Sequence, residues 1–458
     1  MASVNQSSLL HGMAGKLRAS LVAAKCSNRF VRLPAAAAAV DSAHHTRSRF
    51  LSSQVATSKV YEHPSSSWRK PARTSRMISS AMAAGADDGD RAELLGYGLM
   101  VDAAYLTYDA VTKQQPGGGE RYEAVLSGEL DKLIATADAS RRRRRHVVTA
   151  HFFATIEPLQ AVLDALPVVG GVDKTYWFGY VAVARRGDCW DVVVAWRGSS
   201  TLADWMMDMH VMNLVDFGGG AGTAGHVAEG FYNVYTSKDA KVKHGTVSAK
   251  EQAVMEVKRL VDHLRRRSGA AGEKPVKVRV TVTGHSLGGA VAVMTAHDVA
   301  AALAADADAE GVRVRAVTFG APRVGDDAFR RAVAARGVEV FRVIVKQDIV
   351  PKLPMGKEYV DASDGDYDII KLDDGGNWLS PLELIRAHSL DLYLQLITLR
   401  NPAITSVLSN SNSDAPPPPP PAVREEWVNM KEEEGYMRLP LEKLEEELDK
   451  LEGPSPRK

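Results

Sequence analysis

The chain has 458 residues, 45% hydrophobic and 25% charged, and these proportions exclude a fibrous or wholly disordered protein. Its 57 Lys and Arg residues balance 56 Asp and Glu residues, so the net charge of +1 gives no electrostatic reason to expect a nucleic-acid partner. Two cysteines, Cys26 and Cys189, exclude a disulfide framework, and no apolar run reaches the roughly 18 residues of a transmembrane segment.

Residues 1–85 differ in composition from the rest of the chain. They hold twelve Lys or Arg residues but only two acids, Asp41 and Glu62, in a background rich in Ser and Ala. This composition is typical of an organellar transit peptide, and we expect plastid (chloroplast) targeting, with the cytosol or the mitochondrion as alternatives. A basic disordered tail, or an extension upstream of a start at Met77 or Met82, would look similar.

Residues 86–400 show the pattern of one α/β domain. Val-rich runs predict strands at residues 191–196, 276–283, 314–319 and 340–345, and apolar residues with a helical period predict helices at 250–267 and 290–303. Strands that alternate with helices predict a mostly parallel sheet with helices on both faces. The five arginines at 141–145 would attract anionic lipid head groups, although a solvated loop or helix end explains them as well.

The pattern Gly-x-Ser-x-Gly occurs at residues 284–288, directly after a predicted strand and directly before a predicted helix. Such a turn holds the serine in a strained conformation at the carboxyl end of the sheet, and glycines on either side let strand and helix pass closely. We therefore predict that Ser286 is a nucleophile and that the Leu287 N–H stabilises an oxyanion. An ordinary Gly-rich turn would explain the glycines but not both flanking elements.

A serine nucleophile needs a base and a carboxylate that orients it, in the order Ser, acid, His when the serine lies on such a turn. Asp348 follows the strand predicted at 340–345, whereas Asp326 and Asp327 lie where a helix begins and would serve as N-caps. Between Asp348 and residue 400 there is one histidine, His388, and we predict it as the base. His285 precedes the acid and is expected to pack beside the turn.

The loop after residues 191–196 should supply the second oxyanion donor, and we predict Ser199 for this role. Large apolar residues follow it and predict a helical lid over the site, in which Met side chains would adapt to lipid. The predicted lid residues are Leu202, Trp205, Met206 and Met209. A plain core helix has the same period and remains the alternative.

The C-terminal part divides into a linker and a helix. Residues 401–422 include six consecutive prolines and predict a stiff Pro-rich linker. Residues 423–458 are charged, and Leu441, Leu444, Leu448 and Leu451 repeat at helical spacing, which predicts an amphipathic helix that docks on the domain or on a partner.

Five motifs, taken in order, resemble the signature of the fungal-type (class 3) lipases, and among these the plant phospholipase A1 enzymes most closely. The motifs are Trp196-Arg197-Gly198, GHSLGG at 284–289, TFGAPRVG at 318–325, DIVP at 348–351 and AHS at 387–389. The resemblance covers residues 92–400. One departure is Val227-Ala228, where the family often has Val-His.

This resemblance implies an α/β-hydrolase-like fold with a helical lid and hydrolysis of glycerolipid acyl esters, at the sn-1 ester in the plant members. It implies Ser286, Asp348 and His388 as the triad and Ser199 and Leu287 as the oxyanion donors. We expect a glycerolipid substrate at a membrane surface, no cofactor and no metal. Four aspartates would suggest calcium, but their spacing lacks the glycine and glutamate of a calcium loop, so we expect a solvated acidic loop. They are Asp361, Asp364, Asp366 and Asp368.

Two other functions remain open at this stage. A galactolipase, a triacylglycerol lipase or an esterase for soluble esters would use the same triad. A lipid-binding relative without catalysis would use the linker and the C-terminal helix for interactions, although it would have no need for a complete triad.

Overall fold

The computed structural model of the chain describes part of it. The described residues are 88–114, 146–155, 175–199, 213–218, 224–270, 277–305, 311–363, 369–372, 383, 386–399 and 431–452. The predicted transit peptide, the arginines at 141–145, the four predicted lid residues and the Pro-rich linker lie outside these residues.

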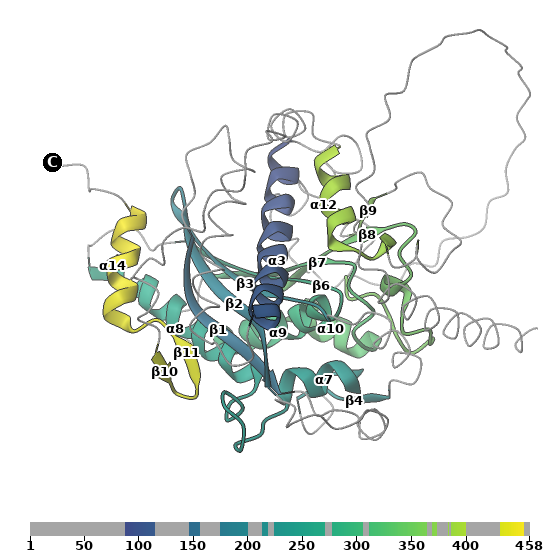
Figure 1. The fold of residues 1–458 in the computed structure, drawn as a ribbon, viewed down its shortest axis with the longest axis horizontal. Helices are drawn as coiled ribbons and strands as arrows, with labels where there is room; N and C mark the ends of the chain where they lie inside the picture. The colour runs from purple at the N-terminus through teal and green to yellow at the C-terminus, as the bar shows by residue number, and fades with distance from the viewer. Residues whose placement is uncertain are drawn as a thin grey trace, which may run out of the picture. The chain divides into compact units, whose positions relative to one another are not determined.

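A nine-stranded sheet organises the described part of the chain (Figure 1), in the order β10-β11-β1-β2-β3-β6-β7-β8-β9. One half is antiparallel and consists of β10 (Lys431–Glu433), β11 (Tyr436–Arg438), β1 (His146–Thr155) and β2 (Thr175–Arg186). The parallel half starts at β3 (Cys189–Trp196) and continues with β6 (Lys277–His285), β7 (Arg313–Phe319), β8 (Glu339–Val345) and β9 (Ile369–Leu372). A separate hairpin pairs β4 (Leu214–Asp216) with β5 (His226–Ala228).

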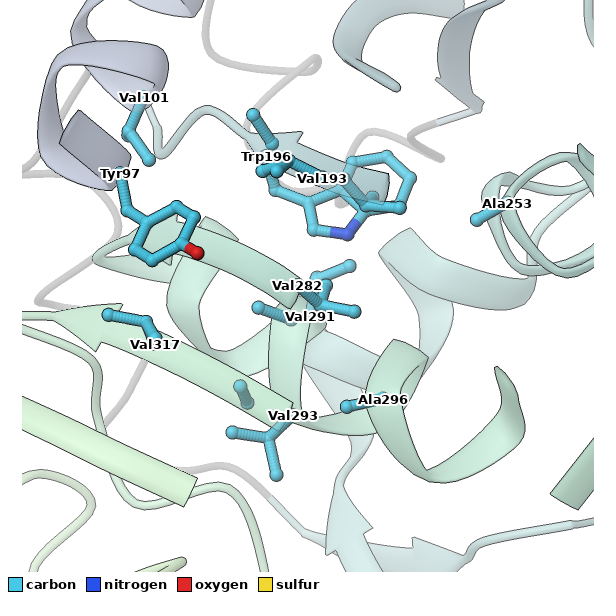
Figure 2. Packing of buried hydrophobic residues seen from close by; sticks show 14 of the residues in the cluster. Tyr97, Val101, Val193, Trp196, Ala253, Val282, Val291, Val293, Ala296 and Val317 are labelled. Atoms are coloured by element: carbon cyan, nitrogen blue, oxygen red, sulfur yellow. The ribbon is translucent and has the colours of Figure 1, made fainter. Parts of the chain in front are cut away.

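Helices pack on both faces of this sheet. The described helices are α3 (Asp88–Gln114), α7 (Glu229–Thr236), α8 (Ala249–Ala270), α9 (Leu287–Ala304), α10 (Asp327–Ala335), α12 (Leu390–Leu399) and α14 (Leu441–Glu452), with a short 3-10 turn, η2 (Val350–Lys352). Side chains of α3, strands and α9 meet in a continuous apolar core (Figure 2). The predicted α/β fold class is confirmed. The sequence predicted β3, β6, β7 and β8 of the parallel half but not β9.

The sheet face covered by α3 contains charged side chains whose burial would be unfavourable without partners of opposite charge. Glu93 of α3 pairs with Arg279 (3.0 Å) and with Arg315, and Asp191 accepts two hydrogen bonds from Arg279 at 3.0 and 2.9 Å. Burial alone would raise the pKa of Glu93, but the guanidinium groups around it, Arg315 foremost, outweigh burial and lower that pKa to about 2. Each buried charge therefore has partners, as a core position demands.

The central helix, α9, is apolar on all sides. Among the described helices it alone has the length and hydropathy of a membrane span, and 78% of it is buried inside the protein. It packs against β3, β6, β7 and α8.

The C-terminal segment docks on the domain. Strand β11 pairs with β1, and α14 buries Leu444 and Leu448 where it contacts β1 and β2. Arg267 of α8 donates to Asp449 (2.7 Å) and to Glu452 (3.0 Å). The choice between domain and partner, which the sequence left open, is thus decided for α14 in favour of the domain.

Candidate active site

A sharp turn joins β6 to α9 at Ser286. This residue has φ of 57° and ψ of −126°. Residues other than glycine rarely adopt a positive φ of this kind. Its N–H donates to Phe319 O (3.0 Å) of β7, and its carbonyl accepts from Gly289 N–H (2.9 Å). The neighbouring strand and the first turn of α9 thus hold the strained serine in place.

The glycines on either side of the serine are needed for close backbone contacts. A Cβ atom on Gly284 would lie 2.2 Å from the Gly288 carbonyl oxygen, and one on Gly288 would lie 2.4 Å from the Arg197 carbonyl oxygen. Either contact is too short for a side chain, so the Gly-x-Ser-x-Gly spacing follows from the distance between β6, α9 and the end of β3.

Asp348 and His388 meet at the carboxyl end of the parallel strands. His388 Nδ1 lies 2.7 Å from Asp348 Oδ2, and both side chains are almost fully buried. The same carboxylate oxygen accepts from the Tyr393 hydroxyl (2.6 Å), and Oδ1 accepts from the Val350 N–H (2.9 Å). Three donors therefore orient the Asp348 carboxylate, and Nδ1–H of His388 faces it.

Two buried polar atoms of this region lack a hydrogen-bond partner among the residues that the structure describes: Ser286 Oγ and His388 Nε2. No hydrogen bond joins them in this structure. Because Nδ1 of His388 donates to a carboxylate, Nε2 of the neutral ring is an acceptor, and Ser286 Oγ–H is a donor. The two atoms are therefore chemically complementary.

His285 contacts both α3 and the main chain of His388. Its Nδ1 is 2.9 Å from the Tyr105 hydroxyl of α3, and its Nε2 is 2.8 Å from the His388 carbonyl oxygen. Its ring centroid lies 4.7 Å from that of His388. Burial, together with the nearby His388, lowers the pKa of His285 well below 6.5, so this ring is neutral.

The predicted oxyanion donors lie on two different elements. Leu287 is the first residue of α9, where backbone N–H groups have no acceptor within the helix. Ser199 follows Gly198, which lies close to Ser286: a Cβ atom placed on Gly198 would be 3.0 Å from Ser286 Cβ. Arg197 fixes this loop, because its Nε donates to Trp177 O (2.9 Å) and its Nη1 to Gly198 O (2.8 Å).

The other acidic residues that the sequence raised and that the structure describes have structural partners. Asp326 caps α10, since its side chain accepts from the Phe329 N–H (2.8 Å), as the N-cap interpretation expected. Asp361 pairs with the buried Arg342 and with Arg323 (3.5 Å), so this part of the acidic loop is held by ion pairs. Asp364, Asp366 and Asp368 lie outside the described residues.

Tyr105 and Tyr393 were not among the predicted site residues. Each contacts the site from a helix: Tyr105 lies 180 positions before His285, and Tyr393 lies 45 positions after Asp348. None of the five motifs contains either tyrosine, and the packing of α3 and α12 brings them to the site.

Known proteins resemble this chain in sequence. The family model described as Lipase (class 3) matches residues 193–358. Phospholipase A1-Igamma1, chloroplastic, of Arabidopsis thaliana is 37% identical over 190 residues, which cover 39% of this chain and 36% of that protein. Phospholipase A1-II 4 of Oryza sativa subsp. japonica is 33% identical over 282 residues, or 58% of this chain and 64% of that protein.

Solved structures resemble it as well. The crystal structure of a lipase from Rhizopus microsporus var. chinensis is 20% identical and has a TM-score of 0.37, covering 60% of this chain and 72% of that one. The chain spans between about one third and two thirds of the length of the curated relatives named above. The segment that the class 3 lipase model matches contains the strained serine and Asp348, whereas His388 lies beyond it.

Proposed function

We propose that the chain is a serine acylhydrolase that cleaves acyl esters of glycerolipids. Ser286 is the nucleophile, His388 the general base and Asp348 the group that orients the base. The observation that carries this proposal is the buried His388–Asp348 hydrogen bond beside a serine held at φ of 57°. This combination places an imidazole whose Nε2 has no hydrogen-bond partner among the described residues near a buried, strained serine.

The reaction proceeds in two steps. Ser286 Oγ bonds to the ester carbonyl carbon while its proton passes to His388 Nε2, and the carbonyl π electrons move onto oxygen. The oxyanion collapses, the bond to the glycerol oxygen breaks, and that oxygen takes the proton from His388. Water then attacks the acyl-enzyme with His388 again as base, and fatty acid leaves Ser286.

Backbone N–H groups stabilise the oxyanion in both steps. We assign this role to Leu287, whose N–H is free of intrahelical bonds, and to Ser199 on the loop that touches Ser286. Each such donor contributes roughly 3–4 kcal/mol to the transition state. Leu202, Trp205, Met206 and Met209 remain our hypothesis for a lid.

The preferred substrate is a phospholipid, cleaved at sn-1. The relatives named phospholipase A1 support this choice. One of them is named chloroplastic, and this supports plastid targeting by residues 1–85. A fluorescent protein fused behind residues 1–85 should accumulate in plastids, whereas cytosolic or mitochondrial fluorescence would contradict the targeting proposal.

The decisive experiment compares the purified full chain with Ser286→Ala. The substrates are dispersed phosphatidylcholine labelled separately at sn-1 and sn-2, galactolipid, triacylglycerol and a soluble nitrophenyl ester. Ser237→Ala, at the C-terminal end of α7, is the matched control.

We expect Ser286→Ala to lose at least about 10³-fold in rate and the control to keep full activity, with label released from sn-1. Release from galactolipid or triacylglycerol alone would retain the mechanism and change the substrate class. Equal rates for wild type and Ser286→Ala would refute the nucleophile and leave lipid binding without catalysis.

A further inference from the structure

His285 occupies a position from which it contacts both partners of the proposed proton transfer. It is the last residue of β6 and precedes Ser286 directly. It is 5% exposed, so its ring makes these contacts away from water. One ring nitrogen meets the Tyr105 hydroxyl (2.9 Å) and the other meets the His388 carbonyl oxygen (2.8 Å).

The partners of His285 fix its tautomer. A carbonyl oxygen only accepts, so His285 Nε2 carries the hydrogen that it donates to His388 O. The neutral ring then presents a lone pair at Nδ1, and the Tyr105 O–H donates to it. Burial raises the pKa of Tyr105, so its hydroxyl keeps the proton that this bond needs.

These bonds connect three elements that are distant in sequence. Tyr105 lies on α3, His285 ends β6, and His388 lies 103 residues after His285, just before α12. Asp348 fixes the ring of His388 through Nδ1, whereas His285 fixes its main chain through the carbonyl oxygen. Two anchors of this kind determine where Nε2 of His388 points.

We propose that Tyr105 and His285 are a positioning pair that sets the place of the His388 imidazole relative to Ser286. This inference rests on the proposed roles of Ser286 and His388. Tyr105 and His285 exchange no proton with substrate. Both act through His388. A displacement of about 1 Å in such a site costs roughly 100-fold in rate, which gives the pair its importance.

The neutral state of His285 is part of this role. When His388 accepts the serine proton, an imidazolium forms with its ring centroid 4.7 Å from that of His285. A second positive charge at that separation would destabilise the imidazolium, because the buried site screens charges weakly. Among the described residues packed against His285, Tyr105 and Tyr393 present hydroxyl groups, and Asp348 is the carboxylate that faces His388.

The test uses three variants of the full chain. His285→Phe removes both hydrogen bonds at similar size, and His285→Gln restores an amide N–H in place of Nε2–H. Tyr105→Phe removes only the hydroxyl and is the mildest change. For each variant we would measure kcat and KM on a soluble nitrophenyl ester, thermal stability, and the downfield NMR proton of His388 Nδ1–H, assigned by its absence in His388→Gln.

We expect His285→Phe to lower kcat about 10- to 100-fold with KM nearly unchanged, and His285→Gln to recover to within about fivefold of wild type. The NMR proton should shift in His285→Phe and return in His285→Gln, and Tyr105→Phe should give an intermediate result. Equal kcat and an unshifted proton in His285→Phe and Tyr105→Phe would overturn the proposal, as would equal losses for Phe and Gln at position 285.

The two proposals fail in distinguishable ways. If wild type hydrolyses no ester faster than Ser286→Ala, the proposed function fails. The NMR comparison still decides whether Tyr105 and His285 position His388, because it needs no substrate.

Discussion

Asp348 receives more hydrogen bonds than a triad requires. Tyr393 donates to Asp348 Oδ2 at 2.6 Å, and its oxygen accepts from the Val345 N–H at 3.1 Å. This tyrosine is fully buried on α12, so it ties the carboxylate to both a helix and the end of β8. The carboxylate therefore depends on Tyr393 for part of its orientation.

Replacing Tyr393 with Phe should lower kcat about 3- to 10-fold and the free energy of unfolding by about 1–2 kcal/mol, since it deletes one charge-assisted bond and leaves the Val345 N–H unpaired. The measurements are ester hydrolysis and urea unfolding. Tyr180→Phe is the control, because it loses a comparable buried bond, to Met100 O at 2.8 Å, away from Asp348. If both variants kept wild-type kcat, Tyr393 would have no part in orienting the acid.

Sequence reasoning selected residues of the site for specific reasons. Ser286 was predicted from the Gly-x-Ser-x-Gly pattern, whose glycines are required by close backbone contacts. Asp348 was predicted because it follows a strand, and His388 because the base must come after the acid. The structure brings Asp348 and His388 to 2.7 Å, whereas the catalytic role of the three residues stays a prediction. Tyr105 and Tyr393 could not be predicted, since a hydroxyl on a helix carries no local signal of what it will contact.

At the scale of elements, the turn between β6 and α9 stores strain at one residue. A side chain at φ of 57° and ψ of −126° costs of order 1–3 kcal/mol, and glycine largely avoids this cost. Ser286→Gly should therefore be more stable than Ser286→Ala by about 1 kcal/mol, although both lack the nucleophile.

Urea unfolding of the two variants measures this difference directly. Their shared loss of the hydroxyl makes each the control for the other. Equal stabilities would mean that the turn relaxes when the serine is removed and that the strain does not belong to the backbone.

Sequence patterns identified some elements and not others. The strands predicted at 191–196, 276–283, 314–319 and 340–345 are confirmed as β3, β6, β7 and β8, because short Val-rich runs between helices leave few alternatives. Strand β1 was missed, since burial of nine of its ten residues removes the alternation that marks a strand. The pairing of β1 with β11 joins residues nearly 290 positions apart, and no local pattern specifies such a register.

The C-terminal helix offers a test of its own contribution. Leu448 of α14 is fully buried, whereas Leu441 on the same helix is 47% exposed. Leu448→Ala should lower the free energy of unfolding by about 2–4 kcal/mol, and Leu441→Ala should change it by less than about 0.5 kcal/mol. A Leu448→Ala variant with an unchanged urea midpoint would show that α14 contributes nothing to the stability of the domain.

Across the whole molecule, α3 joins two regions of polar contacts. Glu93 meets Arg279 and Arg315 near one end of the helix, and Tyr105 meets His285 twelve residues later. Twelve residues of helix span about 18 Å. The ionic pairs therefore fix the register of α3 on the sheet, and this register determines where the Tyr105 hydroxyl lies.

Buried histidines and Glu93 make the stability of the fold depend on pH. Burial lowers the pKa of His151 to about 3 and that of His285 well below 6.5, so both stay neutral in the folded state. In the unfolded chain they take up protons near pH 6.5, and stability is lost as pH falls below that value. Glu93, with its pKa lowered to about 2, adds a loss of stability as pH falls from about 4.5 towards 2.

His151 allows this dependence to be tested at one position. Its Nδ1 accepts from Trp177 Nε1 at 3.2 Å, so His151→Gln can keep an acceptor and remove the titrating ring. Between pH 6 and 5, the free energy of unfolding of wild type should fall more steeply than that of His151→Gln, by about 1.4 kcal/mol per pH unit for one proton. Urea unfolding at pH 7, 6 and 5 measures both slopes. Parallel slopes would mean that water reaches His151 in the folded protein and that its ring takes up a proton without unfolding.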